Sequence, residues 1–196
     1  MLIKKVNKKL TVTKKEAEKA VRILIQWIGE NPDREGLVET PKRLIKSFEE
    51  QFNGYNHNPI TLLEKTFTEI DQYNGMVLLK DIKLESHCEH HIAPILGKVH
   101  IAYIPDKRVV GISKLARVVE AYAKRLQIQE RLTSQIGHAI EDGLKPKGVA
   151  VVIEATHYCL SKRGIRNDSA NMSTQIMLGV FKSNSDLRRE FFQMIK

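Results

Sequence analysis

The stretch SHCEHH, from Ser86 to His91, holds three histidines, a cysteine and a glutamate within six residues. Cys88 and His91 are three residues apart, so on a helical turn their side chains would point to one side. Zinc accepts both thiolate and imidazole ligands, and catalytic zinc sites often use three protein ligands and leave a fourth position to water. The stretch therefore predicts part of a metal site that needs one more ligand. Spacing alone does not choose between His90 and His91.

The further ligand is expected in the stretch EATHYC, from Glu154 to Cys159. If this stretch is a strand, its period of two puts His157 and Cys159 on one face and Tyr158 on the other. Cys159 would then complete a set of two thiolates and one imidazole, with His90 and His157 nearby as free bases. The alternative interpretation is that Cys88 and Cys159 are ordinary buried apolar side chains.

A second group of residues is suited to an anion. Ser113 is expected at the N-cap of a helix, and Lys114 and Arg117 follow on one face of its first turns. Cations at that end oppose the helix macrodipole, whereas a bound anion would explain them. Each could also be a solvated surface cation, but beside a metal site they predict a phosphorylated substrate. Four more cations could join them: Arg163 and Arg166 after the expected metal strand, and Arg43 and Lys46 on one face of an earlier helix.

The elements that must position these residues follow an α+β order. Thr13 and Glu16 match a capping box at the start of a first helix, and a second helix is expected to have Thr40 as N-cap and Pro41 at its first position. The pattern after residue 60 predicts strands over 76–86 and 97–105, helices over 112–126 and 130–144, strands over 148–159 and 171–181, and a closing helix over 185–196. The order strand, strand, helix, helix, strand, strand places both helices on one sheet face. We expect a basic tail and helical annex over 1–59 and a catalytic domain over 60–196.

Composition excludes several classes of protein. The chain has 196 residues, 42% of them hydrophobic, and only two cysteines, so a disulfide framework is excluded. Its net charge of +9 depends on six lysines within residues 1–15; without them 26 basic residues face 23 acidic ones, a balance of +3. Nucleic-acid binding is therefore not expected. No segment is apolar enough for a signal peptide or a membrane span, so we expect a cytoplasmic location.

Several long motifs in order give the chain a specific resemblance. The motifs CEHH, GKVHIAYIP, GISKLARVVEAYAKRLQIQERLT and EATHYCLSKRGI closely resemble GTP cyclohydrolase I. The resemblance covers nearly everything except the basic N-terminus. It implies a tunnelling fold whose sheets assemble between subunits into a barrel, in a homodecamer of two stacked pentamers with active sites between subunits.

The resemblance also implies the reaction. The guanine imidazole ring of GTP would be opened by zinc-dependent hydrolysis, formate would leave, and rearrangement and ring closure would give 7,8-dihydroneopterin triphosphate. This is a first step of tetrahydrofolate and pterin biosynthesis. The positions that match the family's site residues are Cys88, His91 and Cys159 as zinc ligands; His90, His157 and Ser113 as catalytic residues; Ser113, Lys114, Arg117, Arg163, Arg43 and Lys46 as triphosphate contacts; and Gln129 and Glu130 as the guanine-recognition pair.

Two other functions remain open on sequence grounds. The first is that of another enzyme with the tunnelling fold, which reduces the nitrile of a deazaguanine with a nucleophilic cysteine and a nicotinamide cofactor. Consumption of NADPH would reveal this activity. A non-catalytic zinc module that binds nucleic acid would need four ligands and an evenly spread basic face. One departure from the family pattern is His87, which we expect to lie outside the site.

Overall fold

The computed structural model describes residues 12–196 except residue 72, and it divides the chain into two compact units, one ending at Gln51 and the other running from Phe52 to Lys196. In the first unit, helices α1 (Lys14–Trp27) and α2 (Thr40–Gln51) pack on each other. The predicted capping box is confirmed, because the Thr13 side chain accepts from the Glu16 amide and the Glu16 carboxylate accepts from the Thr13 amide. Of the six lysines within residues 1–15, four lie outside the described residues.

The second unit is built around one five-stranded sheet. Its elements, in chain order, are η1 (Asn53–Asn56), η2 (Thr61–Leu63), β1 (Thr66–Phe67), β2 (Val77–Cys88), β3 (Pro94–Ile104), β4 (Val109–Val110), α3 (Ile112–Ala123), β5 (Leu126–Gln127), α4 (Gln129–Leu144), β6 (Gly148–His157), α5 (Tyr158–Ser161), β7 (Met172–Gly179), α6 (Val180–Ser183) and α7 (Ser185–Ile195). The sheet order is β5-β2-β3-β6-β7, with β5 parallel to β2 and the other pairs antiparallel. The short strands β1 and β4 pair separately.

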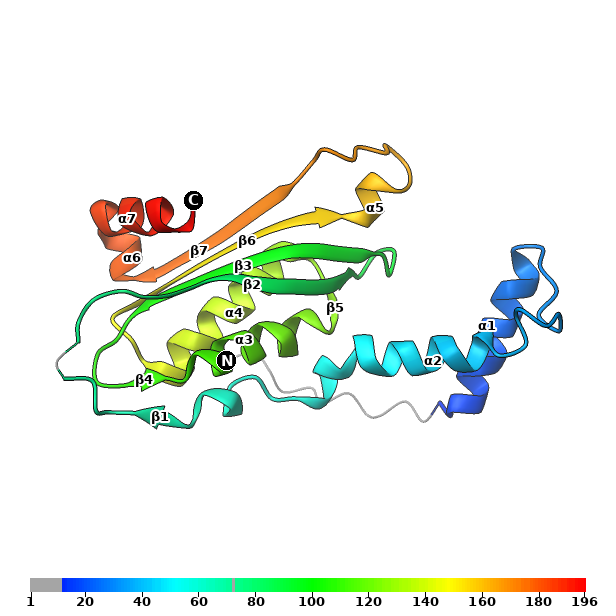
Figure 1. The fold of residues 1–196 in the computed structure, drawn as a ribbon, viewed down its shortest axis with the longest axis horizontal. Coiled ribbons are helices and arrows are strands. Elements are labelled where there is room, and N and C mark those ends of the chain that lie inside the picture. The colour runs from blue at the N-terminus through cyan, green and yellow to red at the C-terminus, as the bar shows by residue number, and fades with distance from the viewer. Residues whose placement is uncertain (1–11, 72) are drawn as a thin grey trace. The chain divides into compact units, whose positions relative to one another are not determined.

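Alternation along the central strands gives the sheet two buried faces. Val99, Ile101 and Tyr103 of β3 belong to the main core with α3 and α4, whereas Ala102 and Ile104 belong to a smaller core with α6 and α7. Successive strand side chains point to opposite faces, so one apolar run can serve both cores. Figure 1 shows α3 and α4 along one face and α6 and α7 at the other. The predicted α+β order is confirmed, with both central helices on one face.

Several predicted boundaries differ from those of the structure. Helix α2 begins at Thr40, so Thr40 is its first residue and not its N-cap, and Pro41 is at the second position. Two other differences affect site residues. Ser113 is not the N-cap of α3: Gly111 is the N-cap, and Ser113 is the second helical residue. The strand that carries His157 does not reach Cys159. It ends at His157, which pairs with Ile95, and the next partner would be Pro94, which has no N–H to donate to the ladder. Cys159 therefore lies on the short helix α5.

No helix among the described residues is both long enough and apolar enough to cross a membrane.

Candidate metal centre

A tight turn between β2 and β3 brings Cys88 and His91 together. The Cys88 amide donates to Ala93 O at 2.8 Å, and the Ile92 amide donates back to Cys88 O at 2.8 Å. Ile92 takes a φ of 53° to close this turn. In this geometry Nδ1 of His91 lies 3.9 Å from the sulfur of Cys88. The turn therefore places these two side chains on one side, as predicted.

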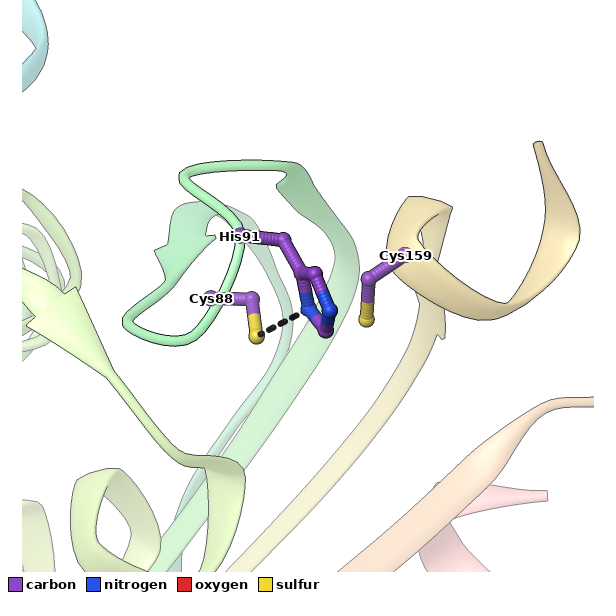
Figure 2. Close-up of side chains that lie close together, drawn as sticks. All are labelled: Cys88, His91 and Cys159. Atoms are coloured by element: carbon purple, nitrogen blue, oxygen red, sulfur yellow. Dashed lines mark hydrogen bonds between the residues drawn. The ribbon is translucent and has the colours of Figure 1, made fainter. Parts of the chain in front are cut away.

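Cys159 reaches the same point from α5. Figure 2 shows Cys88, His91 and Cys159 pointing toward one another from the β2–β3 turn and α5. One ligand atom from each of the three lies within 4.8 Å of the others, and Cys88 is buried while Cys159 is half-buried. Two thiols and one imidazole are a donor set that suits zinc and leaves a coordination position for water. These three side chains could therefore hold a metal ion.

The neighbouring histidines are not part of this group. Nδ1 of His90 also lies 3.9 Å from the Cys88 sulfur, but His90 is mostly exposed and the three-residue group contains His91 instead. The His87 ring packs against Phe52 with a centroid distance of 5.1 Å. Glu89 forms an ion pair with Arg131, which holds the pKa of the Glu89 carboxyl below its usual range. Of these three residues, only His90 has a side chain both exposed and next to the thiols.

The electrostatics of the thiols matter for loading a metal. Burial raises the pKa of Cys159, and the adjacent Cys88 thiol raises it further, because two thiolates without a cation would repel each other. Both sulfurs are free thiols in this structure. A metal that binds Cys159 would therefore have to displace its thiol proton.

His157 lies beside this group and lines a cavity of about 440 Å³ together with Cys159. Burial lowers the pKa of His157, and the Glu130 carboxylate partly opposes that shift, so the ring is neutral at pH 7. Nε2 of His157 lies 2.7 Å from Oε1 of Gln129. Other residues of the cavity wall, which the sequence did not single out, are Ala155, Leu160, Ala170, Asn171 and Met172. Their residue types do not indicate a site. They lie at the cavity because of the fold, chiefly the pairing of β6 with β7.

The predicted guanine-recognition pair is divided between the interior and the surface. Gln129 is fully buried, and its amide is hydrogen-bonded inside the protein. Glu130, the next residue of α4, is exposed. Its carboxylate is therefore the member of the pair that is open to a ligand.

Of the predicted phosphate contacts, one lies at the metal group. Nη1 of the exposed Arg163 is 2.9 Å from Nε2 of His91. Arg166 is exposed in the loop that follows. Arg43 and Lys46 are both exposed on α2 of the first unit, and their predicted roles remain predictions.

Ser113, Lys114 and Arg117 do not lie at the metal group of the same chain. Helix α3 ends where the Ala123 carbonyl accepts a hydrogen bond from Ser86, two residues before Cys88. It begins just after Val110, whose amide donates to the hydroxyl of Tyr103, at the other end of β3. Figure 1 shows α3 running from β4 to β5. Its twelve residues span about 18 Å. Within one chain, Ser113 and Lys114 therefore lie most of that length from the metal end of the helix, and Arg117 lies about half of it away.

The N-terminus of α3 nonetheless has the features expected of an anion site. No side chain caps it. The Lys114 amide donates to Gly111 O at 2.8 Å, whereas the amides of Ile112 and Ser113 have no acceptor among the described residues. Among the described residues, no carboxylate lies within ion-pair distance of Lys114 or Arg117. Arg117, at the middle of α3, is exposed and lines a cavity of about 340 Å³ that extends toward the C-terminal end of the helix.

Comparison with known proteins connects this geometry to a family. The family model described as GTP cyclohydrolase I matches residues 17–196. GTP cyclohydrolase 1 of Pelagibacter ubique is 50% identical over 184 residues, which cover 94% of this chain and 91% of that protein. GTP cyclohydrolase 1 of Brucella suis is 52% identical over 183 residues, covering 93% and 86%. A solved structure of the archaeosine synthase QueF-Like in the apo form covers 55% of this chain and 97% of its own at 19% identity, with a TM-score of 0.47, too distant to support a conclusion. The model match and the two relatives show that this chain belongs to the GTP cyclohydrolase I family.

Proposed function

We propose that this enzyme opens the guanine imidazole ring of GTP by zinc-dependent hydrolysis, releases formate and forms 7,8-dihydroneopterin triphosphate. The observation that carries the proposal is the gathering of Cys88, His91 and Cys159 in a chain of this family. Zinc held there would supply a bound water whose pKa is lowered to about 7, and so a hydroxide at neutral pH.

His90 and His157 transfer protons to and from the guanine ring in this proposal. Histidine titrates near neutral pH and can protonate the ring nitrogen that becomes basic when the ring opens. His90 is exposed beside the thiols, and His157 lines the adjacent cavity. Neither ring is needed as a ligand, so both stay available for proton transfer.

Glu130 recognises guanine. A carboxylate can accept two hydrogen bonds from the N–H edge of guanine, which adenine does not present. A site built for such hydrogen bonds rejects the wrong base strongly, because its polar groups would then go unpaired.

The triphosphate is bound by the N-terminus of α3, supplied by a second copy of the chain. Ser113 and Lys114 lie at the far end of α3 from their own metal group, and Arg117 lies at the middle of the helix. A substrate that contacts both clusters therefore has to lie between two subunits, as in the proposed homo-oligomer, a decamer whose sheets join into the barrel of a tunnelling fold. Arg163, Arg43 and Lys46 complete the set of phosphate contacts in this proposal.

The reaction is tested by incubating the zinc-loaded protein with GTP and measuring formate together with the fluorescent pterin formed on oxidation. We expect both products in equal amounts and no consumption of added NADPH. NADPH consumption with a deazaguanine nitrile, in the absence of formate release from GTP, would contradict the proposal.

The shared site is tested by complementation. Cys159→Ala removes the metal end and should be inactive. Arg117→Ala weakens the phosphate end, so at GTP concentrations well below KM it should keep about a tenth to a hundredth of the activity. In oligomers mixed at equal amounts, about a quarter of the sites combine two intact ends if the ends come from different chains. Recovery of activity on co-expression supports the shared site, and no recovery contradicts it.

A further inference from the structure

Gln129 is an unusual residue to find buried at the start of a helix. It is the first residue of α4 and is fully buried. Its amide nitrogen lies 2.8 Å from Met172 O, 3.1 Å from Ile153 O and 3.1 Å from the hydroxyl of Thr174. Its amide oxygen lies 2.7 Å from Nε2 of His157. Both ends of this side-chain amide are thus hydrogen-bonded inside the protein.

These neighbours fix which way the Gln129 amide points. The carbonyls of Ile153 and Met172 can only accept hydrogen bonds, so the NH₂ group has to face them. The opposite orientation would bring the amide oxygen against two carbonyl oxygens, which can only accept hydrogen bonds, and so would be unfavourable. The amide oxygen therefore faces His157.

This orientation determines the tautomer of His157. The Gln129 oxygen can only accept, so Nε2 of His157 has to carry a proton and donate it. A neutral imidazole has one N–H and one lone pair, so the lone pair is on Nδ1. Among the described residues, Nδ1 of His157 has no hydrogen-bond partner.

Two threonines hold Gln129 from the other side. Thr133 donates to the backbone carbonyl of Gln129 at 2.8 Å, which leaves the Thr133 oxygen to accept from the Thr174 hydroxyl at 2.6 Å. The Thr174 oxygen then accepts from the Gln129 amide. Each of the two threonine hydroxyls thus donates one hydrogen bond and accepts one, so the two hydroxyls have a single direction.

We propose that Gln129 is a positioning residue, which holds His157 as the Nε2–H tautomer so that His157 exchanges protons with the substrate through Nδ1. The part about substrate rests on the proposed function; the part about the tautomer does not. The predicted contact between the Gln129 side chain and guanine would have to replace one of its buried hydrogen bonds, whereas a contact from Glu130 needs no such exchange.

The tautomer is measured by nitrogen-15 NMR of protein labelled in histidine, at about pH 8, where a buried ring of lowered pKa is neutral. The His157 signals are assigned by their loss in His157→Ala. We expect a protonated Nε2 and an unprotonated Nδ1 in the wild-type protein. We expect a mixture of tautomers in Gln129→Met, which keeps the length of the side chain but offers only a weak sulfur acceptor in place of the amide oxygen. A protonated Nδ1 in the wild-type protein would overturn the proposal.

The kinetic test separates positioning from guanine binding. If Gln129 acts through His157, Gln129→Met should lower kcat for formate release about a hundredfold, with KM for GTP changed less than about threefold. A raised KM with kcat unchanged would assign Gln129 to guanine binding and overturn the proposal. If Gln129→Met does not fold, kcat and KM for GTP are measured in Thr174→Val instead. We expect a smaller fall in kcat, again with little change in KM. A raised KM with kcat unchanged would again overturn the proposal. If the wild-type protein releases no formate, the proposed function fails, and the tautomer measurement still decides the role of Gln129.

Discussion

The two ends of helix α3 differ in whether the side chains gathered there have interaction partners within the chain. At its C-terminal end, Cys88, His91, Cys159 and His157 converge, and His157 is fixed by a 2.7 Å hydrogen bond to a buried amide. At its N-terminal end, Lys114 and Arg117 have no ion-pair partner among the described residues, and no side chain caps the first amides.

This difference separates the two tasks that the site would perform. Bond-breaking chemistry depends on the placement of reacting groups to a fraction of an ångström, and buried hydrogen bonds can provide it. Binding a triphosphate needs positive charge and open donors, which can stay solvated until the anion arrives. The predictions below change one end at a time.

The largest effect is expected from Cys159→Ala. Removing one of three ligands should abolish both metal retention and formate release, because the remaining thiol and imidazole cannot hold zinc in place. Elemental analysis of the purified variant measures retention. Cys159→Ser is the size-matched control and should lose the metal as well. If either variant keeps its zinc, the ligand assignment is wrong.

His90→Ala should keep the metal and lose activity. His90 lies 3.9 Å from the Cys88 sulfur but outside the three-residue group, so we expect a fall of about a hundred- to ten-thousandfold in formate release. The matched control is His138→Ala, an exposed histidine on α4 whose ring bonds to the Ser134 carbonyl. Unchanged formate release in His90→Ala would remove the proton-transfer role.

Metal affinity should rise with pH over a wide range. Zinc binds thiolates, so each thiol proton that it displaces should add about tenfold to the affinity per pH unit below the thiol pKa. The pKa of Cys159 lies above its ordinary value because of burial and the adjacent Cys88 thiol. The affinity should therefore keep rising beyond the usual thiol pKa and fall as the pH is lowered. Competition with a chelator at a series of pH values measures this. A plateau at neutral pH would mean that the thiols are already ionised without metal.

Arg117→Ala should weaken GTP binding without affecting metal content. A charge-assisted contact to phosphate is worth about 1.5–3 kcal/mol, or about ten- to a hundredfold in affinity. Calorimetric titration of metal-free protein measures it, with guanosine as a ligand that lacks phosphates. The control is Arg189→Ala, in an exposed ion pair with Asp186 on α7. Guanosine should bind far more weakly than GTP, and Arg117→Ala should narrow that gap. Equal affinities of the wild-type protein for both ligands would remove the anion site.

The parts of the fold that local signals determine were predictable from the sequence. The capping box at Thr13 and Glu16 and the strand predicted over 97–105 depend on residues a few positions apart. The capping box is confirmed, and β3 covers nearly all of the predicted strand. The end of β6 was not predictable. It depends on Pro94 in the neighbouring strand, which leaves the ladder without a donor beyond His157.

The site was predictable as a set of residue types but not as a geometry. The strand argument for placing Cys159 beside His157 was wrong, although Cys159 still reaches the group through α5. The role of Gln129 depends on Thr174, 45 residues away, which no local pattern announces. The distance between the metal group and Ser113 depends on the direction of α3 along the sheet, and that direction follows from the sheet topology alone.

The smallest effect is expected from Ser113→Ala. This variant tests whether a neutral hydroxyl matters beside the charged side chains at the N-terminal end of α3. Ser113 is exposed at the second position of α3, beside the open amides. Its hydroxyl is neutral, and a neutral hydrogen bond contributes about 0.5–1.5 kcal/mol, or about two- to twelvefold in affinity for GTP. The matched control is Ser185→Ala, an exposed serine in the first turn of α7. If Ser113 only binds phosphate, the loss should appear in the affinity of metal-free protein for GTP and not in kcat. If it takes part in catalysis, as the family pattern implies, kcat should fall while affinity stays within error. A loss as large as that of Arg117→Ala would contradict the view that charge dominates binding at this end of α3.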